Sequence, residues 1–298
     1  MTIDPSRIGL RAPVLVLQPG AFSPWETTAS FQDVVEVVKA ADRLGYHHVT
    51  CSEHIGVPAD QALRRGARYY DPLATFGHFS AVTRQIRFAT SVLVLGYHHP
   101  LEIAKRYGTL DVVSGGRTIL GFGVGSLKEE FDLLGLGGPE FTERGVRGDD
   151  ALRALRAALG QGEPAYDGPF YKFGGLVVDP CAVQTLTPLW IGGRSARSLR
   201  RAVELGDGWV PFGLDLEAMG AMIAHAADTE AWAARTAPLE IVLTSGGPID
   251  PIGEPEATAA GLRRVFAAGA TKAAVRIHAK SANHHIEQLE RLLELPVG

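Results

Sequence analysis

Short apolar runs alternate with longer stretches of helical periodicity along the whole chain. The runs are rich in β-branched and aromatic residues and are almost continuously apolar, which is typical of strands buried on both faces of a parallel sheet. We predict strands at residues 14–17, 46–52, 86–95, 117–123, 189–191, 209–212, 239–244 and 273–278.

Helical periodicity follows each of these runs. In the first helix Ser30 and Asp33 form a capping-box pattern, the apolar positions that follow share one face, and Gly45 ends the helix. Asp71 and Pro72 begin the second helix, since proline is favoured in the first turn. The remaining helices are predicted at residues 101–113, 149–159, 195–205, about 215–234, 255–268 and 283–293.

Eight strand–helix units in 298 residues predict an α/β fold, a (β/α)8 TIM barrel with rim insertions, formed by one domain over residues 1–298. A doubly wound sheet would carry a dinucleotide-binding glycine fingerprint at its first turn, and the sequence has none there. The long irregular stretch 160–188 is expected to be an excursion on the upper rim of the barrel.

Composition narrows the classes of function. The net charge of −4 gives no basic field for nucleic acid or a membrane surface. No apolar run approaches the ~18 residues needed to span a bilayer, and residues 1–11 lack a signal-peptide core, so we expect a cytoplasmic protein. The two cysteines, Cys51 and Cys181, are too few for a disulfide scaffold, and no cluster has zinc or calcium spacing, so we predict no metal site.

An anion site is indicated at the turn Gly192-Gly193-Arg194-Ser195, between a short buried strand and an amphipathic helix. Glycine permits close approach of the backbone, and the amides at a helix start favour negative charge. The Arg194 guanidinium adds a fork that matches a phosphate. In a barrel this turn lies on the active-site face, where strands end. We therefore predict a phosphorylated ligand here.

A second candidate is Glu53-His54, at the end of the second predicted strand. These residue types suit hydrogen bonding to a cofactor and proton transfer. Neighbours on a strand point to opposite faces, so a mutual pair is not expected. The alternative interpretation is a loop histidine beside a solvated glutamate.

Glycines recur at positions 121, 123 and 125, where the fourth predicted strand ends. Without side chains, the backbone at Gly121, Gly123 and Gly125 could receive a flat ring. A crowded barrel corner that needs glycine is an equal alternative. His98 and His99, before Pro100, either line the pocket or form a structural pair.

Four segments resemble the luciferase-like monooxygenase superfamily, and most closely its coenzyme F420-dependent oxidoreductases. They are ADRLGYHHVTCSEH, DPLATFGHFSAVTRQIRFATSVLVLGYHHP, LEIAKRYGTLDVVSGGRTILGFGVG and PLWIGGRSARSLRRAVELGDGWVPF, which cover most of residues 35–212 in the expected order. The resemblance implies a barrel that is usually dimeric and that holds F420 or FMN at its C-terminal face.

The resemblance also implies site residues. It places a non-proline cis peptide at Ser91-Val92, after Thr90, as a bulge behind the deazaflavin ring. The family's phosphate loop falls on Gly192-Gly193-Arg194-Ser195, and its glycine run on residues 121, 123 and 125. Two positions depart from the pattern: Glu53 stands where many relatives have aspartate, and Ser126 where the sugar-phosphate dehydrogenases have glutamate. The second departure argues against a sugar 6-phosphate substrate.

We therefore predict an F420-dependent oxidoreductase that transfers a hydride between the deazaflavin and a small organic substrate. His54 would donate or accept the proton, and Glu53 would position the cofactor or His54. The expected partners are a small molecule and a second copy of the chain in a homodimer, with no nucleic acid and no membrane. Two alternatives remain open: an FMN-dependent monooxygenase that uses reduced flavin and O2, and a non-catalytic flavin-binding protein.

Overall fold

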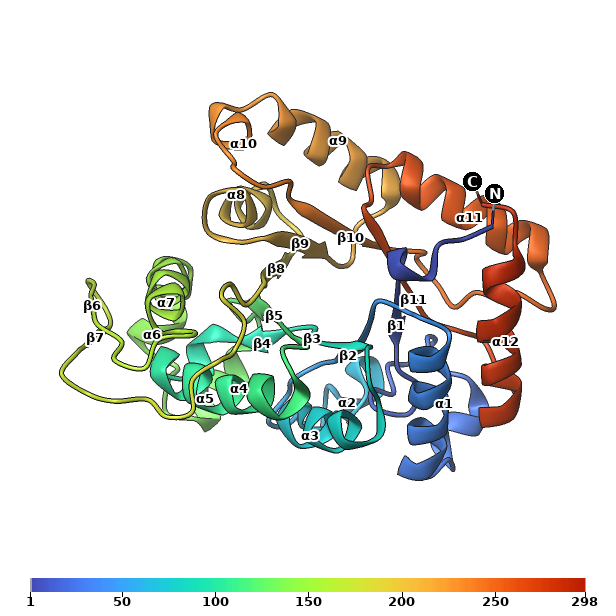
Figure 1. Ribbon diagram of the computed structural model, residues 1–298, viewed down its shortest axis with the longest axis horizontal. Helices are drawn as coiled ribbons and strands as arrows, with labels where there is room; N and C mark the ends of the chain where they lie inside the picture. Colours follow the sequence, from blue (N-terminus) through green and yellow to red (C-terminus); the bar gives the residue numbers. More distant parts are fainter. Residues whose placement is uncertain (1, 298) are drawn as a thin grey trace.

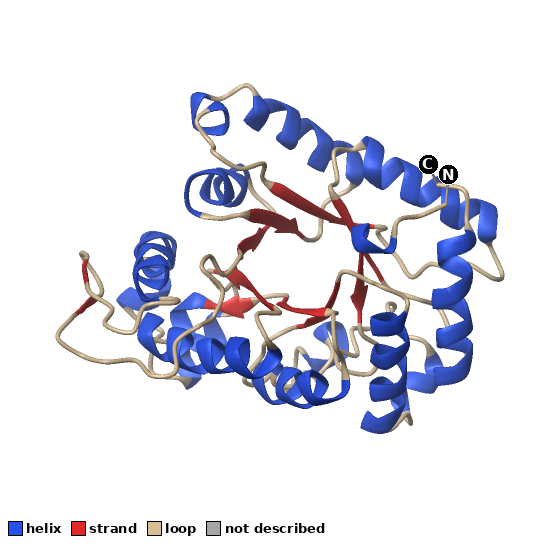
Figure 2. Cartoon of the chain, viewed as in Figure 1, coloured by secondary structure: helices blue, strands red, loops and turns tan. Residues whose placement is uncertain are grey.

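The computed structural model describes residues 2–297. Parallel strands form a closed ring with helices packed around it, as Figures 1 and 2 show. The order around the ring is β3-β2-β1-β11-β10-β9-β8-β5, and β5 pairs with both β3 and β4, which closes the barrel. The strands are β1 (Ile8–Arg11), β2 (His48–Cys51), β3 (Arg87–Thr90), β4 (Leu93–Val94), β5 (Thr118–Gly123), β8 (Leu189–Gly193), β9 (Gly208–Pro211), β10 (Glu240–Thr244) and β11 (Lys272–Val275). The predicted (β/α)8 barrel is therefore confirmed, with β3 and β4 as two parts of one barrel strand.

The outer helices begin where the capping signals predict. Ser30 caps the first of them through a capping box with Asp33, and Asp71 caps the second by accepting from the Ala74 amide. The predicted helix 215–234 is two helices, because Thr229 caps a new start. The longer helices are α1 (Phe31–Arg43), α3 (Pro72–Val82), α4 (Pro100–Ser114), α7 (Arg144–Ala158), α8 (Ala196–Leu205), α9 (Leu216–Ala227), α11 (Pro255–Ala267) and α12 (Ala282–Glu294).

Short elements fill the loops between these units. They are η1 (Pro5–Arg7), η2 (Pro24–Thr27), η3 (Leu95–Tyr97), α2 (Ala62–Arg65), α5 (Lys128–Leu133), α6 (Pro139–Thr142) and α10 (Glu230–Ala233). The excursion 160–188 carries a two-stranded antiparallel hairpin, β6 (Tyr166–Asp167) and β7 (Lys172–Phe173). In Figure 1 this hairpin projects away from the ring of strands.

The predicted first strand at 14–17 is wrong, because β1 lies six residues earlier. Gly9 faces the barrel interior, where a Cβ would lie 2.0 Å from His48 Cε1, so the position next to this histidine must be glycine. With Gly9 and Arg11 as alternate residues, β1 does not read as an apolar run. The apolar run at 14–17 belongs to the loop after β1, where Val14 has a φ of 69°.

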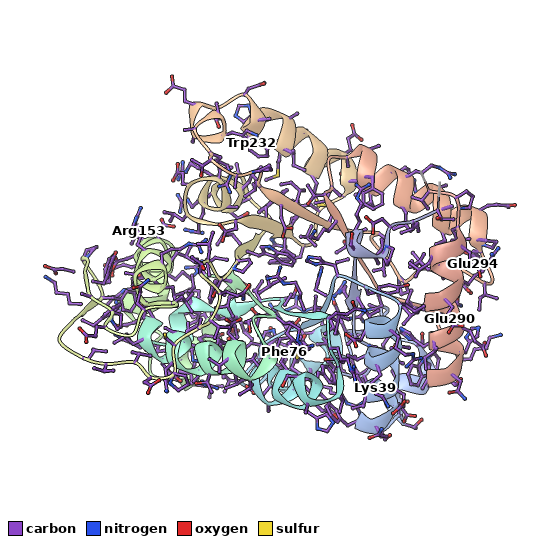
Figure 3. All side chains as sticks on the ribbon, viewed as in Figure 1. Lys39, Phe76, Arg153, Trp232, Glu290 and Glu294 are labelled. Atoms are coloured by element: carbon purple, nitrogen blue, oxygen red, sulfur yellow. The ribbon has the colours of Figure 1, made fainter. Side chains whose placement is uncertain are left out.

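Two apolar cores hold the barrel together. The larger one lies between the strands and the helices, where, for example, the Phe76 and Phe88 rings stack at 5.4 Å. Figure 3 shows Phe76 within this packed layer, whereas Arg153 on α7 projects outward. A small second core fills the barrel itself and consists of Ala89, Ile119, Trp190, Val210, Val242 and Ala274. The barrel is thus packed below its mouth.

A polar cluster closes the opposite end of the barrel, where the strands begin. His47 and His48 contact each other through their Nδ1 atoms at 2.9 Å, and Trp190 Nε1 donates to Glu240 at 3.0 Å. Lys272 Nζ also reaches Glu240, at 3.0 Å. Burial, with Lys272 nearby, lowers the pKa of His47 to about 3. His47 and His48 thus lie at the end of the barrel opposite the active-site face.

Within residues 2–297 we find no helix whose length and apolar character would let it cross a bilayer.

Candidate active site at the barrel mouth

The strand formed by β3 and β4 is interrupted at Ser91-Val92, and the peptide bond between them is cis. The cis bond implied by the resemblance is confirmed. Neighbouring strands hold the interruption in place, because the Ser91 amide donates to the Cys51 carbonyl at 2.8 Å and Ser52 Oγ donates to the Ser91 carbonyl at 2.6 Å. Thr90 Oγ1 both donates to the Gly121 carbonyl, at 2.9 Å, and accepts from the Gly121 amide, at 2.7 Å.

The Val92 side chain lies among glycines of two strands. A Cβ on Gly123 would lie 2.8 Å from Val92 Cγ2, and one on Gly192 would lie 2.8 Å from Val92 Cγ1. At Gly121 a Cβ would meet the Thr90 carbonyl oxygen at 2.1 Å. A side chain at any of these positions would therefore collide with the segment around Val92, as the crowded-corner alternative requires.

Gly125 is needed for a related reason. Its φ is 79°, and a Cβ would lie 2.6 Å from the Phe131 ring of α5. The glycine thus lets the chain leave β5 and turn toward α5, which carries Glu130.

The turn between β8 and α8 has the form of an anion site. Gly193 has a φ of 138°, and a Cβ there would strike Ser198 Cβ at 2.6 Å. Ser195 caps the helix by accepting from the Ser198 amide, which leaves the Ala196 and Arg197 amides in the first turn without an intrahelical acceptor. Arg194 is exposed and makes no hydrogen bond or ion pair within residues 2–297. Its guanidinium is thus available to a ligand.

Glu53 is buried at 8% exposure, and both of its carboxylate oxygens are engaged. Oε2 accepts from the Val94 amide at 2.8 Å, and Oε1 lies 2.7 Å from His98 Nε2. Burial opposes protonation of His98, but the hydrogen bond and charge of Glu53, with the charge of Glu102, raise its pKa overall. Glu53 therefore fixes the segment after the cis bond and holds the ring of His98.

His54, in the loop after β2, contacts a different partner. Its Nδ1 lies 2.8 Å from Glu130 Oε2, and the ring of Tyr69 lies edge-on to its own at 4.4 Å. The side chain of His54 keeps 21% exposure, whereas that of Glu130 has 1%. His54 is thus held by a buried partner, while part of its side chain remains accessible.

Glu130 is the residue at this site that sequence reasoning missed. Besides His54 it accepts from Tyr97 Oη at 2.8 Å and from the amides of Ile55, at 2.8 Å, and Gly56, at 3.2 Å. Burial alone would raise its pKa, but the hydrogen bonds from His54 and Tyr97 and the charge of His54 lower it overall. An ionised carboxylate can only accept, so Nδ1 of His54 carries a proton and Nε2 is left for a ligand.

Comparison with known proteins shows the family and the fold. The sequence pattern of the luciferase-like monooxygenase family matches residues 13–292. The chain belongs to the luciferase-like monooxygenase family. Members of this family are oxidoreductases, so the predictions of family and of an oxidoreductase are confirmed.

This luciferase-like protein is 28% identical over 236 residues to an uncharacterized protein of Mycobacterium tuberculosis (strain ATCC 25618 / H37Rv), covering 75% of this chain and 80% of that protein. Its fold is similar to that of an F420-dependent secondary alcohol dehydrogenase in complex with an F420-acetone adduct, with a TM-score of 0.74 and 14% identity over 96% of this chain and 97% of that one. It is also similar to the oxygenating constituent of 3,6-diketocamphane monooxygenase from Pseudomonas putida in complex with FMN, with a TM-score of 0.68 and 15% identity over 96% and 99% of the two chains. At these identities the structural likeness shows the fold alone. Enzymes of this fold thus use either cofactor.

No group of three or more His, Cys, Asp or Glu side chains in the described part of the chain is placed to hold a metal ion.

Proposed function

We propose that this protein transfers a hydride between coenzyme F420 and a small organic substrate at the mouth of the barrel. The observation that carries the proposal is the His54–Glu130 pair. It supplies a proton-transfer group with one fixed and one open ring nitrogen, beside the cis bond of β3 and β4. A deazaflavin supplies a hydride when it is bound and reduced, and reduction of a carbonyl also needs a proton.

The residues of the mouth fit a phosphorylated ring cofactor. Gly192, Gly193, Arg194 and Ser195 offer free first-turn amides and an unpaired guanidinium for the phosphate. Thr90, Ser91 and Val92, with the glycines of β5 (Gly121, Gly123) and Gly125 after it, would form the support behind the ring.

His54 acts through Nε2 in this proposal. Glu130 keeps Nδ1 protonated and stabilises the imidazolium form, in the way that a buried carboxylate orients a histidine base. Glu53 is a positioning residue, because its carboxylate fixes Val94 and His98 and makes no bond to His54.

The experiment is a titration of cofactor-free protein with F420 and, separately, with FMN, followed by fluorescence. We expect micromolar or tighter binding of F420, followed by substrate-dependent change of the deazaflavin absorbance. Micromolar binding of FMN without binding of F420 would replace the proposal by the FMN-dependent monooxygenase. Tight binding of F420 without turnover on any of a panel of alcohols, aldehydes and ketones would indicate a non-catalytic carrier.

A further inference from the structure

Two arginines project into the barrel at its mouth. On β1, Ile8 and Leu10 belong to the outer core, so the alternate residues Gly9 and Arg11 face inward. On β11, Ala274 belongs to the inner core, so Arg276, two residues later, also faces inward. Leu10 is in register with Val275, which places Arg11 and Arg276 side by side at the next step of the two strands.

Neither guanidinium is neutralised by an ion pair within residues 2–297. Arg11 is half-buried, and its side chain makes no hydrogen bond with this part of the chain. Arg276 has only 6% exposure; its Nη1 donates to the Ala21 carbonyl at 2.9 Å, and its buried Nε has no partner. Burial and the charge of Arg276 lower the pKa of Arg11 to about 10.

Glu26 is the carboxylate whose charge acts on Arg276, and it is already engaged. Its two oxygens accept from the amides of Val14 and Ser23, each at 2.7 Å, at 2% exposure. Glu26 therefore acts on Arg276 without forming an ion pair, and the only charge within residues 2–297 that acts on Arg11 is that of Arg276. Removing one or two cations from water without a partner is costly, and a bound anion would offset that cost.

The arginines lie across the mouth from the proposed cofactor support. Around the ring, β2 and β3 separate β1 from β5, and β10 and β9 separate β11 from β8. Tyr69 lies between this side and His54, because its ring packs against the His54 ring. Burial raises the pKa of Tyr69; the charge of Glu130 adds to this shift, and the charge of Arg276 opposes it. A ligand held by the arginines would thus extend past Tyr69 toward His54.

We propose that Arg11 and Arg276 bind an oxyanion of the substrate, a carboxylate or a phosphate ester, and so select anionic substrates. The proposal rests on the proposed function for the reaction that the bound molecule undergoes, but the anion site itself does not depend on which cofactor is used. Planar guanidiniums form paired hydrogen bonds with either kind of oxyanion.

The test is protection of arginine from phenylglyoxal in the unaltered, cofactor-free protein, read residue by residue from peptide masses. Benzoate and phenyl phosphate serve as matched probes, with chloride at equal ionic strength as the baseline. We expect one probe or both to slow modification of Arg11 by about fivefold or more, while exposed Arg153 changes by less than about twofold. The stronger probe identifies the kind of oxyanion. Unchanged modification of Arg11 with both probes would overturn the proposal, and so would equal slowing at Arg153 or protection confined to Arg194.

A variant gives a second reading by calorimetry with benzoate and phenyl phosphate. Arg11→Gln should weaken binding of the protecting probe by about tenfold or more, with Arg153→Gln as the unchanged control. Equal affinity in a folded Arg11→Gln protein would also overturn the proposal. Protection of Arg11 in a protein that binds neither F420 nor FMN would refute the proposed function and leave the anion site. Binding of F420 without protection of Arg11 would refute the anion site and leave the proposed function.

Discussion

The two sides of the barrel mouth differ in how far contacts within the protein account for their residues. The glycine wall (Gly121, Gly123 and Gly192) has every Cβ direction filled by Val92 or the Thr90 carbonyl. The arginine wall (Arg11 and Arg276) leaves charge without an ion pair. Packing within the protein explains the residues of the glycine wall, whereas it leaves those of the arginine wall unexplained. Packing thus fixes the glycine wall, whereas the oxyanion that we propose accounts for the arginine wall.

His54 stands between the two walls, and its removal has the largest expected effect. His54→Gln should lower the rate of hydride transfer by about 10²–10⁴-fold, the usual contribution of a general acid–base group. Cofactor affinity should stay unchanged, because His54 is not part of the phosphate loop. Stopped-flow absorbance of the deazaflavin measures the rate. An unchanged rate and pH profile would remove His54 from the mechanism.

Gly121→Ala tests the glycine wall most severely. The new methyl would meet the Thr90 carbonyl oxygen at 2.1 Å, and a backbone atom cannot rotate away. We expect a loss of about 3 kcal/mol or more in the free energy of unfolding, measured in urea. Gly77→Ala in α3, where no atom lies within 4 Å, is the matched control and should be neutral or stabilising. Equal stability of the two variants would contradict the packing account.

The polar cluster of His47, His48, Glu240 and Lys272, at the end where the strands begin, forms the barrel floor. This floor should dominate the loss of stability in acid. The pKa of His47 on this floor is lowered to about 3, mainly by burial, and burial also lowers the pKa of His48 beside it. In the outer helix α12, burial lowers the pKa of His285 to about 3 as well. The unfolded chain binds these protons below pH ~6.5, whereas the folded chain does not, so stability falls as pH falls from about 6.5 toward 3. The loss per group by pH ~5 is roughly 2 kcal/mol. His98 acts in the opposite direction, because its pKa is raised.

Urea unfolding at a series of pH values measures this effect. His47→Gln should make the fall in unfolding free energy between pH ~6.5 and ~5 less steep, since one of the three histidines with a lowered pKa is gone. An identical slope in this variant and the parent would show that the floor does not control acid stability.

Gly192→Ala and Val92→Ala test whether the glycine wall is built around one side chain. Gly192→Ala alone should cost about 1–2 kcal/mol of unfolding free energy, because its Cβ meets Val92 Cγ1 at 2.8 Å. Shortening Val92 removes that atom, so the double variant should be more stable than the sum of the single effects by about 1 kcal/mol. Strict additivity would disprove the contact.

Arg194→Gln and Arg11→Gln compare the turn between β8 and α8, where we propose that the phosphate binds, with the arginine wall. Loss of the exposed Arg194 fork should raise the dissociation constant of F420 by about tenfold. Arg11→Gln should change it by less than about twofold, since Arg11 lies on the opposite side of the ring. Equal weakening in the two variants would mean that the arginine wall also holds the cofactor.

Much of the fold is readable from the sequence, because buried parallel strands are apolar on both faces and helix starts carry local caps. Ser30 and Asp71 show this, since each cap bonds within three residues. The first strand could not be read in this way. Its inward positions are a glycine beside His48 and an arginine at the mouth, so its apolar pattern is broken.

The site was only partly predictable. The glycines, the phosphate turn and Glu53-His54 stand at strand ends, which a barrel brings together. Glu130 lies 76 residues from its partner His54. Nothing in its local pattern distinguishes it from the solvated glutamate beside it. Arg11 was not predicted either, because a first strand at 14–17 would not place residue 11 at the barrel mouth.

The wedge of Val92 between two strands has a consequence for how the family can change. Its two methyl groups press on Gly123 of β5 and Gly192 of β8, so a single branched residue restricts two distant positions. Lineages that replace this valine by a smaller residue are released from both restrictions at once. Among related sequences, alanine at position 123 or 192 should therefore occur together with a small residue at position 92.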